Sequence, residues 1–352
     1  MTKHKSSRTH GAPLRKQTAQ RVAQRRSPWL PLGLGAVAVA ALLLWLVLGR
    51  DQQPATPTPV NATATAPASV SPWPVGPADG CRAGPRFQTA LGTSAQAALA
   101  TNLTNIKGLA IFDPAANSGQ GSLYQHPSWD DAGYLGPFFS DRDGNIFTAP
   151  VPLVSLVDNP PDQQNRVYRV DTDTQAMSLF AELPAAQPAS GNPFGVVGLA
   201  YDCDTNSLYA SSIAGSTAAQ EAGRIFHLDA ATGQLLDQLD NVDAMGIGVF
   251  NSTEGKRLYI AHIRTQQISS IALDALGRFT GEPRLEFSYA SHIAGGRAVV
   301  RRIRFTNAQQ MVMNMMDFNY SLQVASEQIE DLLTYQYDPA SNAWTFTSLQ
   351  AK

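Results

Sequence analysis

The chain has 352 residues, of which 43% are apolar and 15% charged, and its formal net charge is −2. This charge is divided unevenly: all 28 acidic residues but only 17 of the 26 basic ones lie after residue 50, which gives residues 51–352 a net charge of −11. Because phosphate binding needs a basic surface, this composition argues against nucleic acid as a partner.

The first 49 residues resemble a membrane signal-anchor. Residues 1–27 form a basic tail without Asp or Glu, and residues 28–49 are uncharged and rich in Ala, Leu and Val. A run of this length is enough to cross a bilayer as a helix. The positive-inside rule then leaves the N-terminus in the cytoplasm and the C-terminal part in the periplasm or cell exterior. The long basic region favours a retained anchor over a cleaved signal peptide.

Residues 50–80 are rich in Pro, Thr and Ala and predict a disordered linker, which leaves residues 81–352 as one extracytoplasmic domain. The two cysteines, Cys81 and Cys203, both fall in that domain. Disulfides persist on this side of a membrane, so the pair is a candidate disulfide. The sequence does not show how far apart these two cysteines lie in space, so two free thiols are the alternative.

A short sequence motif recurs five times. In it, apolar residues occupy every second position, and the motif ends in Asp. The copies are Ala110–Asp113, Tyr168–Asp171, Phe226–Asp229, Ile271–Asp274 and Tyr335–Asp338. Positions one and three before each Asp are apolar, which predicts a strand with one buried face. The Asp then opens a turn, because its side chain can accept a hydrogen bond from the backbone two residues on. These five aspartates are therefore expected to be structural.

A second strand pair precedes four of these hairpins, as at Gly195–Tyr201 with Ser207–Tyr209. Four antiparallel strands per unit predict the blade of a β-propeller. We expect an all-β propeller of five blades, with six as the alternative. The first hairpin lacks a clear partner pair, so either residues 86–106 supply short inner strands or the two chain ends complete one blade.

From about residue 105 to residue 350 the pattern resembles propellers with NHL, YVTN or SMP-30/gluconolactonase-like repeats. The phrase Gly223–Gly233 is typical of their outer hairpins, and Asn192–Asp202 looks like uncharacterised bacterial exported propellers. The resemblance implies the fold and is nearly silent on activity.

Several other motifs have structural explanations. Asp141–Asn145 begins like a calcium loop, but the Gly and Glu that such a loop needs are missing, so we expect a hairpin turn. Gly246 and Gly248 are explained by close packing near the propeller axis. Met311, Met313 and Met315 alternate along one strand and are assigned to the core.

Loops that join the second and third strands of a blade, and loops between blades, emerge on the same rim of a propeller. Long loops of this kind are where binding sites usually lie. The candidate ligand-binding residues on this rim are Asp130, Asp131, Asn192, Asp243, His262, Arg264, His292, Asp317 and Asn319.

Two functions compete. The first is a membrane-tethered module that binds a protein or small-molecule ligand through the long-loop rim, without a cofactor. The second, implied by the resemblance, is a lactone hydrolase with calcium in the central channel. Such enzymes use a Glu ligand early in the first blade, whereas the first Glu here is Glu182. The remaining candidates, Asn192, Asp243 and Asp317, do not form a catalytic set, which favours the binding module.

Overall fold

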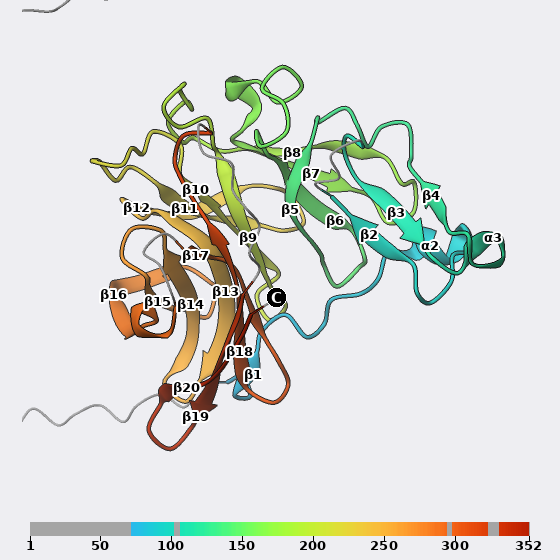
Figure 1. Cartoon of the computed structure of the whole chain (residues 1–352). Coiled ribbons are helices and arrows are strands. Elements are labelled where there is room, and N and C mark those ends of the chain that lie inside the picture. The colour runs from blue at the N-terminus through green and yellow to red at the C-terminus, as the bar shows by residue number, and fades with distance from the viewer. Residues whose placement is uncertain (1–71, 102–105, 294–297, 323–330, 352) are drawn as a thin grey trace, which may run out of the picture. The chain divides into compact units, whose positions relative to one another are not determined.

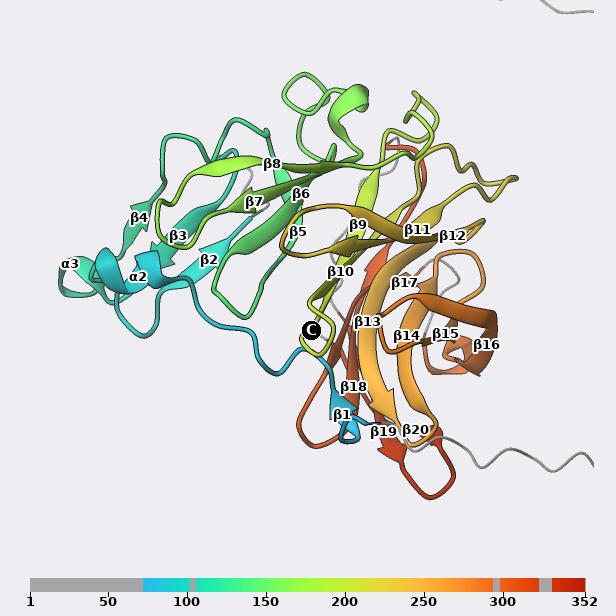
Figure 2. The same ribbon diagram turned by 180° about the vertical axis from the view of Figure 1, so that it is seen from behind.

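The computed structural model describes residues 72–101, 106–293, 298–322 and 331–351. Within these residues the strands form five antiparallel sheets, and the chain is a five-bladed β-propeller, as predicted (Figures 1 and 2). The basic tail, the anchor segment and the linker up to residue 71 lie outside the described residues. In the described part of the chain, no helix has the length and apolar character needed to span a bilayer.

The blades follow one another in chain order, and short helical turns lie between some of the strands. The first blade has three strands, β2 (Ala98–Ala100), β3 (Ala110–Asp113) and β4 (Ser122–Tyr124). The second has β5 (Leu135–Ser140), β6 (Ile146–Pro150), β7 (Arg166–Val170) and β8 (Met177–Glu182). The third has β9 (Val196–Asp202), β10 (Ser207–Ser212), β11 (Arg224–Asp229) and β12 (Leu235–Asp240).

The fourth blade has β13 (Ala244–Ser252), β14 (Gly255–His262), β15 (Gln267–Leu273) and β16 (Phe279–Ser288), and the short β1 (Gly76–Pro77) joins it beside β13. The fifth has β17 (Ala298–Phe305), β18 (Gln310–Asp317), β19 (Leu332–Asp338) and β20 (Ala343–Gln350). The helical turns are α2 (Arg86–Ala90), α3 (Ala116–Gly119), η1 (Pro161–Gln163) and η2 (Ala290–His292).

The five repeated aspartates form the turns that the sequence predicts. Each accepts a hydrogen bond from the backbone N–H two residues on, at 2.8–3.1 Å. The residues are Asp113, Asp171, Asp229, Asp274 and Asp338. The Asp141 carboxylate accepts in the same way from the N–H of Asp143 and also from that of Asn145, so this segment is the predicted hairpin turn.

The two apolar positions before the Asp are buried in four of the five copies, although in the third copy His227 between them is buried as well, and the first copy differs. There Phe112, at a position predicted to be buried, is 48% exposed, while Ile111 is buried. Ile111 packs in a cluster with Phe87 of α2 and Trp129. In this three-stranded blade α2 covers the face that Ile111 occupies, so Ile111 is buried and Phe112 is exposed, while Ala110 is buried as predicted.

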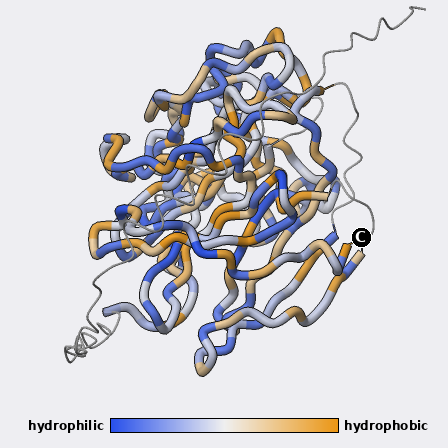
Figure 3. Tube along the Cα trace, turned by 90° about the vertical axis from the view of Figure 1, so that its left-hand side faces the viewer, coloured by the Kyte–Doolittle hydropathy of each residue, from blue (hydrophilic) through white to orange (hydrophobic). Residues whose placement is uncertain are grey.

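The core lies between neighbouring sheets, and hydrophobic and hydrophilic residues alternate in short runs along the strands (Figure 3). Met311, Met313 and Met315 are buried between the last two blades, as predicted. A Cβ atom on Gly246 would lie 2.9 Å from the Val300 side chain, and one on Gly248 would lie 3.0 Å from Phe305. Glycine on β13 therefore lets β17 approach closely, which confirms the expected packing near the axis.

Candidate functional site

Consecutive antiparallel strands are connected at alternating ends, so the connections of the propeller gather at two rims. The two rims differ in the length of these connections. At one end lie short turns, among them 141–145, 203–206, 253–254 and 339–342, which we call the tight-turn rim. At the other end lie longer connections, among them 151–165, 183–195 and 213–223, which we call the long-loop rim. The fourth blade departs from the predicted contrast, since its connections at the long-loop rim, 241–243 and 263–266, are also short.

Asp243 is the centre of a cluster on the long-loop rim. Its side chain is fully buried, and its Oδ2 accepts hydrogen bonds from Arg264 Nε at 2.8 Å and from the Tyr320 hydroxyl at 2.5 Å. Its Oδ1 accepts from the Ser216 hydroxyl and from the Gly223 N–H. Burial, followed by the hydrogen bond to Asp243, raises the pKa of Tyr320 well above its usual value. This one carboxylate therefore connects loops of the third, fourth and fifth blades.

Arg264 fixes the loop 213–223 through its guanidinium group. It donates to the carbonyl oxygens of Thr217, Ala218 and Gln220, and it lies 5.3 Å from the Tyr320 ring centre. A cation over an aromatic ring contributes about 0.5–1 kcal/mol at such partly exposed sites. A cavity of about 350 Å³ lies beside the cluster, with Arg264, Asn319 and Tyr320 in its wall.

Asn192 and His262 lie at the same rim and also make internal contacts. The Asn192 amide donates to the carbonyl oxygens of Ile213 and Ser216, and its Oδ1 accepts from the Phe194 N–H. His262 is hydrogen-bonded through Nε2 to the Ser269 hydroxyl at 2.6 Å, and burial lowers its pKa. The side chains of both residues therefore stabilise the rim through internal hydrogen bonds.

The other predicted residues are placed apart from these contacts. Asp130 and Asp131 are exposed in the connection between the first two blades. The His292 ring stacks on Phe346 at 3.8 Å. Asp317 ends β18, and the exposed Asn319 accepts hydrogen bonds from Ser321. Of the nine residues, the structure thus brings together Asp243 and Arg264 directly, with Asn192 linked to them through Ser216.

These residues do not fit a calcium ion. Among the residues that the structure describes, no three His, Cys, Asp or Glu side chains gather as metal ligands would. The oxygens of Asn192 and Asp243 already accept hydrogen bonds from the protein, including one from the Arg264 cation. A calcium ligand needs an oxygen that faces the ion and is free of a neighbouring positive charge. No catalytic step through a metal follows from this set.

The tight-turn rim is covered by the N-terminal segment, which we define as residues 72–91. In Figure 1 it is the blue segment that runs from β1 beside β13 to α2. β1 pairs with the end of β13 through Gly76 and Asn251, so the last residues of the segment 50–80, which the sequence assigns to the linker, belong to the sheet. The segment then passes the turns of the third and second blades.

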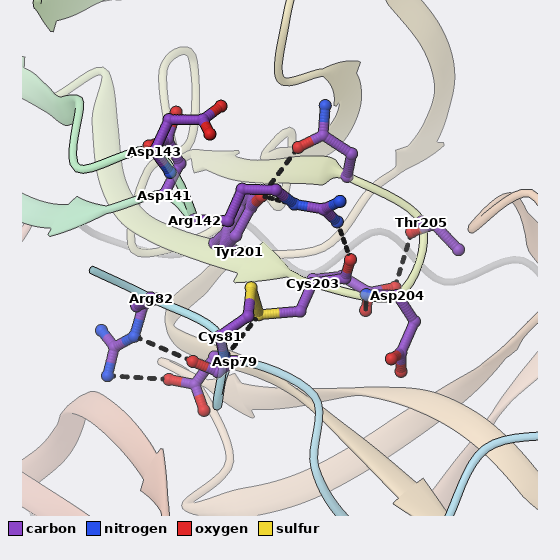
Figure 4. Close-up of a disulfide and its surroundings, with 12 residues drawn as sticks. Asp79, Cys81, Arg82, Asp141, Arg142, Asp143, Tyr201, Cys203, Asp204 and Thr205 are labelled. Carbon is purple, nitrogen blue, oxygen red and sulfur yellow. Dashed lines mark hydrogen bonds and ion pairs between the residues drawn. A yellow bond between two sulfur atoms is a disulfide. The ribbon is translucent and has the colours of Figure 1, made fainter.

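Three contacts fix the N-terminal segment. Cys81 and Cys203 form a disulfide to the β9–β10 turn (Figure 4). The Ala83 N–H donates to the Asp141 carbonyl oxygen in the turn of the second blade. Arg86 then forms an ion pair with Asp173 at 2.6 Å.

Neighbouring tight turns are also joined to one another. Lys256 Nζ is buried and lies 2.5 Å from Asp202 Oδ1, 2.7 Å from Asp204 Oδ2 and 4.3 Å from the Trp73 ring centre. Arg142 donates to the Tyr201 hydroxyl and to the Cys203 carbonyl oxygen (Figure 4). This rim is therefore closed by backbone pairing, a disulfide and buried charges.

The alternative function placed a calcium ion in the central channel, but the arginines that line this channel were not among the predicted site residues. A cavity of about 100 Å³ lies between the inner strands of the second to fifth blades, and Arg301, Arg302 and Arg304 of β17 lie in its wall. Three arginines within four residues of a predicted inner strand were the available sequence signal. The negative net charge of residues 51–352 hides this local basic cluster in the composition.

Two solved structures that the chain resembles are distant in sequence. No protein-family model matches the chain, and no curated protein matches it. A solved chain described as "Crystal structure of Nidogen/Laminin Complex" has 10% identity and a TM-score of 0.38, over 71% of this chain and 91% of that one. A putative 6-phosphogluconolactonase from Bacteroides uniformis has 12% identity and a TM-score of 0.37, over 72% and 82%. The resemblance to NHL, YVTN and SMP-30-like repeats stays a prediction.

Proposed function

We propose that this protein is a membrane-tethered, extracytoplasmic binding or scaffold module that presents its long-loop rim to a protein or small-molecule ligand. The observation that carries the proposal is the position of the N-terminal segment. It reaches the propeller at the tight-turn rim and is joined there by β1 pairing and by the Cys81–Cys203 disulfide. A tether that enters at this end leaves the long-loop rim on the far side of the domain.

The chemistry of the long-loop rim supports the same proposal. The cavity beside Arg264, Asn319 and Tyr320 has a volume of about 350 Å³, within the range of roughly 300–1,000 Å³ that is usual for ligand pockets. Asp243 holds the surrounding loops in place, so the cavity wall is largely preformed. Preformed walls lower the entropic cost of binding.

Site-specific cross-linking tests the binding surface. A photo-crosslinking residue is placed at Asn319, which is exposed on the long-loop rim, in the full-length chain expressed in its host. The matched control carries the same residue at Ala340, which is exposed in the β19–β20 turn of the tight-turn rim. We expect one defined cross-linked product from Asn319 and none from Ala340. Products from Ala340 alone, equal products from both, or none from either would overturn the proposal.

Membrane extraction tests the tether separately. We expect the full-length chain to stay in the membrane fraction after an alkaline carbonate wash, which removes peripheral proteins. A variant that lacks residues 28–49 is expected in the soluble fraction. Complete release of the full-length chain by the wash would contradict the tether and leave the cross-linking result standing.

A further inference from the structure

The three arginines of β17 share one region of the propeller because a β-bulge interrupts the strand. Val300 pairs with Met315 and Arg302 pairs with Asn314, so Arg301 is the extra residue between them. In a regular strand, alternation would send Arg301 and Arg302 to opposite faces. A bulge re-aims side chains in this way and is over-represented next to functional sites.

A second and larger cavity opens on the same arginines. It has a volume of about 400 Å³ and lies between β2 of the first blade, β5 of the second, and β17 and β18 of the fifth. Its wall contains Arg301, Arg302 and Arg304 together with Phe138 and Asn314, and no acidic side chain among the residues described. Both this cavity and the central one therefore share a basic wall.

The charge of this region is opposite to that of the domain. Of the residues that the structure describes, the walls of the two cavities together contain four arginines, the fourth being Arg82, and one acidic residue, Asp79. Asp79 is already paired with Arg82 at 2.9 Å. Residues 51–352 carry −11 in total. A concave region of one charge with low-dielectric walls focuses the electrostatic potential and attracts ligands of the opposite charge.

Two polar groups in the wall, the Arg304 guanidinium and Asn314 Oδ1, make no hydrogen bond with the residues that the structure describes. Arg304 is exposed and makes no hydrogen bond or ion pair with any residue that the structure describes. Asn314 lies opposite Arg302 in the register, and its Oδ1 is buried without a hydrogen-bond partner. A buried polar atom without a partner is costly, so it usually indicates a bound ligand or water.

We propose that the basic wall of Arg301, Arg302 and Arg304 binds a small molecule that carries a phosphate or carboxylate group. The planar guanidinium group of arginine forms paired hydrogen bonds with both oxyanions, and these are about twice as strong as bonds between neutral groups. Phe138 and Leu99 offer apolar contacts for the rest of the molecule. This site depends on neither the membrane tether nor the long-loop rim, so it goes beyond the proposed function.

Calorimetric titration of the full-length protein tests the site, with inorganic phosphate and citrate as separate probes and sodium chloride of equal ionic strength as the blank. We expect saturable binding of at least one probe at millimolar concentration. Arg304→Gln should weaken that binding by at least about tenfold, since a hydrogen bond to a charged group contributes about 1.5–3 kcal/mol. Arg304→Lys keeps the charge and should lose less.

The matched control is Arg278→Gln, which removes an exposed arginine of the β15–β16 turn and should leave the affinity unchanged. A second measurement needs no variant: phosphate or citrate should protect Arg304, and not Arg278, from modification by phenylglyoxal. No saturable binding of either probe would overturn the proposal. Equal affinity of Arg304→Gln and the unmodified protein, or equal modification of Arg304 with and without the probe, would do the same.

Discussion

The two rims of the propeller are stabilised by different means. At the tight-turn rim, the N-terminal segment adds a strand and a disulfide, and the buried Lys256 pairs with Asp202 and Asp204. These contacts join segments that are far apart in the sequence. At the long-loop rim, one buried carboxylate, Asp243, holds the loops through hydrogen bonds. Covalent and buried ionic contacts therefore fix the tight-turn rim, while hydrogen bonds to one carboxylate hold the long-loop rim. The difference separates an end that the N-terminal segment fixes from an end that hydrogen bonds between loops organise.

The largest expected effect comes from removal of the disulfide at the tight-turn rim. Cys81 and Cys203 are separated by 122 residues. The chain-entropy model gives about 4–5 kcal/mol of stabilisation for a loop of this length. We expect the double variant Cys81→Ala, Cys203→Ala to lose stability of this order in urea unfolding, and the reduced protein to match it. A loss below about 1 kcal/mol would show that the disulfide does not fix this end.

Lys256→Met compares buried and exposed ion pairs at the two rims. It leaves the buried Asp202 without its cation, for which we expect a loss of about 3–5 kcal/mol. The matched control is Lys107→Met, which removes a largely exposed pair with Asp158 of the connection 151–165. Solvent screens this exposed pair, so we expect a much smaller loss for the control. The measurement is the free energy of unfolding in urea. Equal losses for the two variants would show that the buried pair stabilises the protein no more than the exposed one.

Tyr320→Phe tests the hydrogen bonds that hold the long-loop rim. It removes the donor to Asp243 Oδ2, and we expect a loss of about 1–2 kcal/mol together with faster proteolysis in the loop 213–223. Tyr134→Phe is the control, since the Tyr134 hydroxyl makes no hydrogen bond with a described residue. Unchanged proteolysis of Tyr320→Phe would show that Asp243 does not organise these loops.

The smallest expected effect is a pH dependence shared by both rims. Burial lowers the pKa of His227, and it lowers that of His262. The unfolded chain therefore takes up protons first, so stability should decrease as the pH falls below about 6.5. His227→Gln and His262→Gln should each make this decrease less steep between pH 6.5 and the lowered pKa. The measurement is urea unfolding across this pH range, and unchanged slopes would contradict the assignment.

The sequence predicts the repeat well because its signal is local. An Asp that accepts from the N–H two residues on needs only its own turn, and all five such turns are present. The burial of Ile111 in place of Phe112 depends on α2, which packs on the first blade from a separate segment. No alternation within a strand can reveal such a contact.

The sites depend on contacts between blades, which the sequence shows only in part. Asp243 and Arg264 were predicted to lie on one rim, but their pairing with Tyr320 depends on how the fourth and fifth blades approach each other. The basic wall of the channel depends on a bulge at Arg301 and on the side chains of other blades. Strand alternation predicts neither.

Hydrogen–deuterium exchange of the full-length protein before and after reduction of the disulfide tests the division between the rims most directly. We predict that reduction speeds exchange in the N-terminal segment and in the turns 203–206 and 253–254, while the loops 213–223 and 263–266 keep their rates. Exchange that rises equally at both rims, or mainly in the long loops, would contradict the separate stabilisation of the two rims.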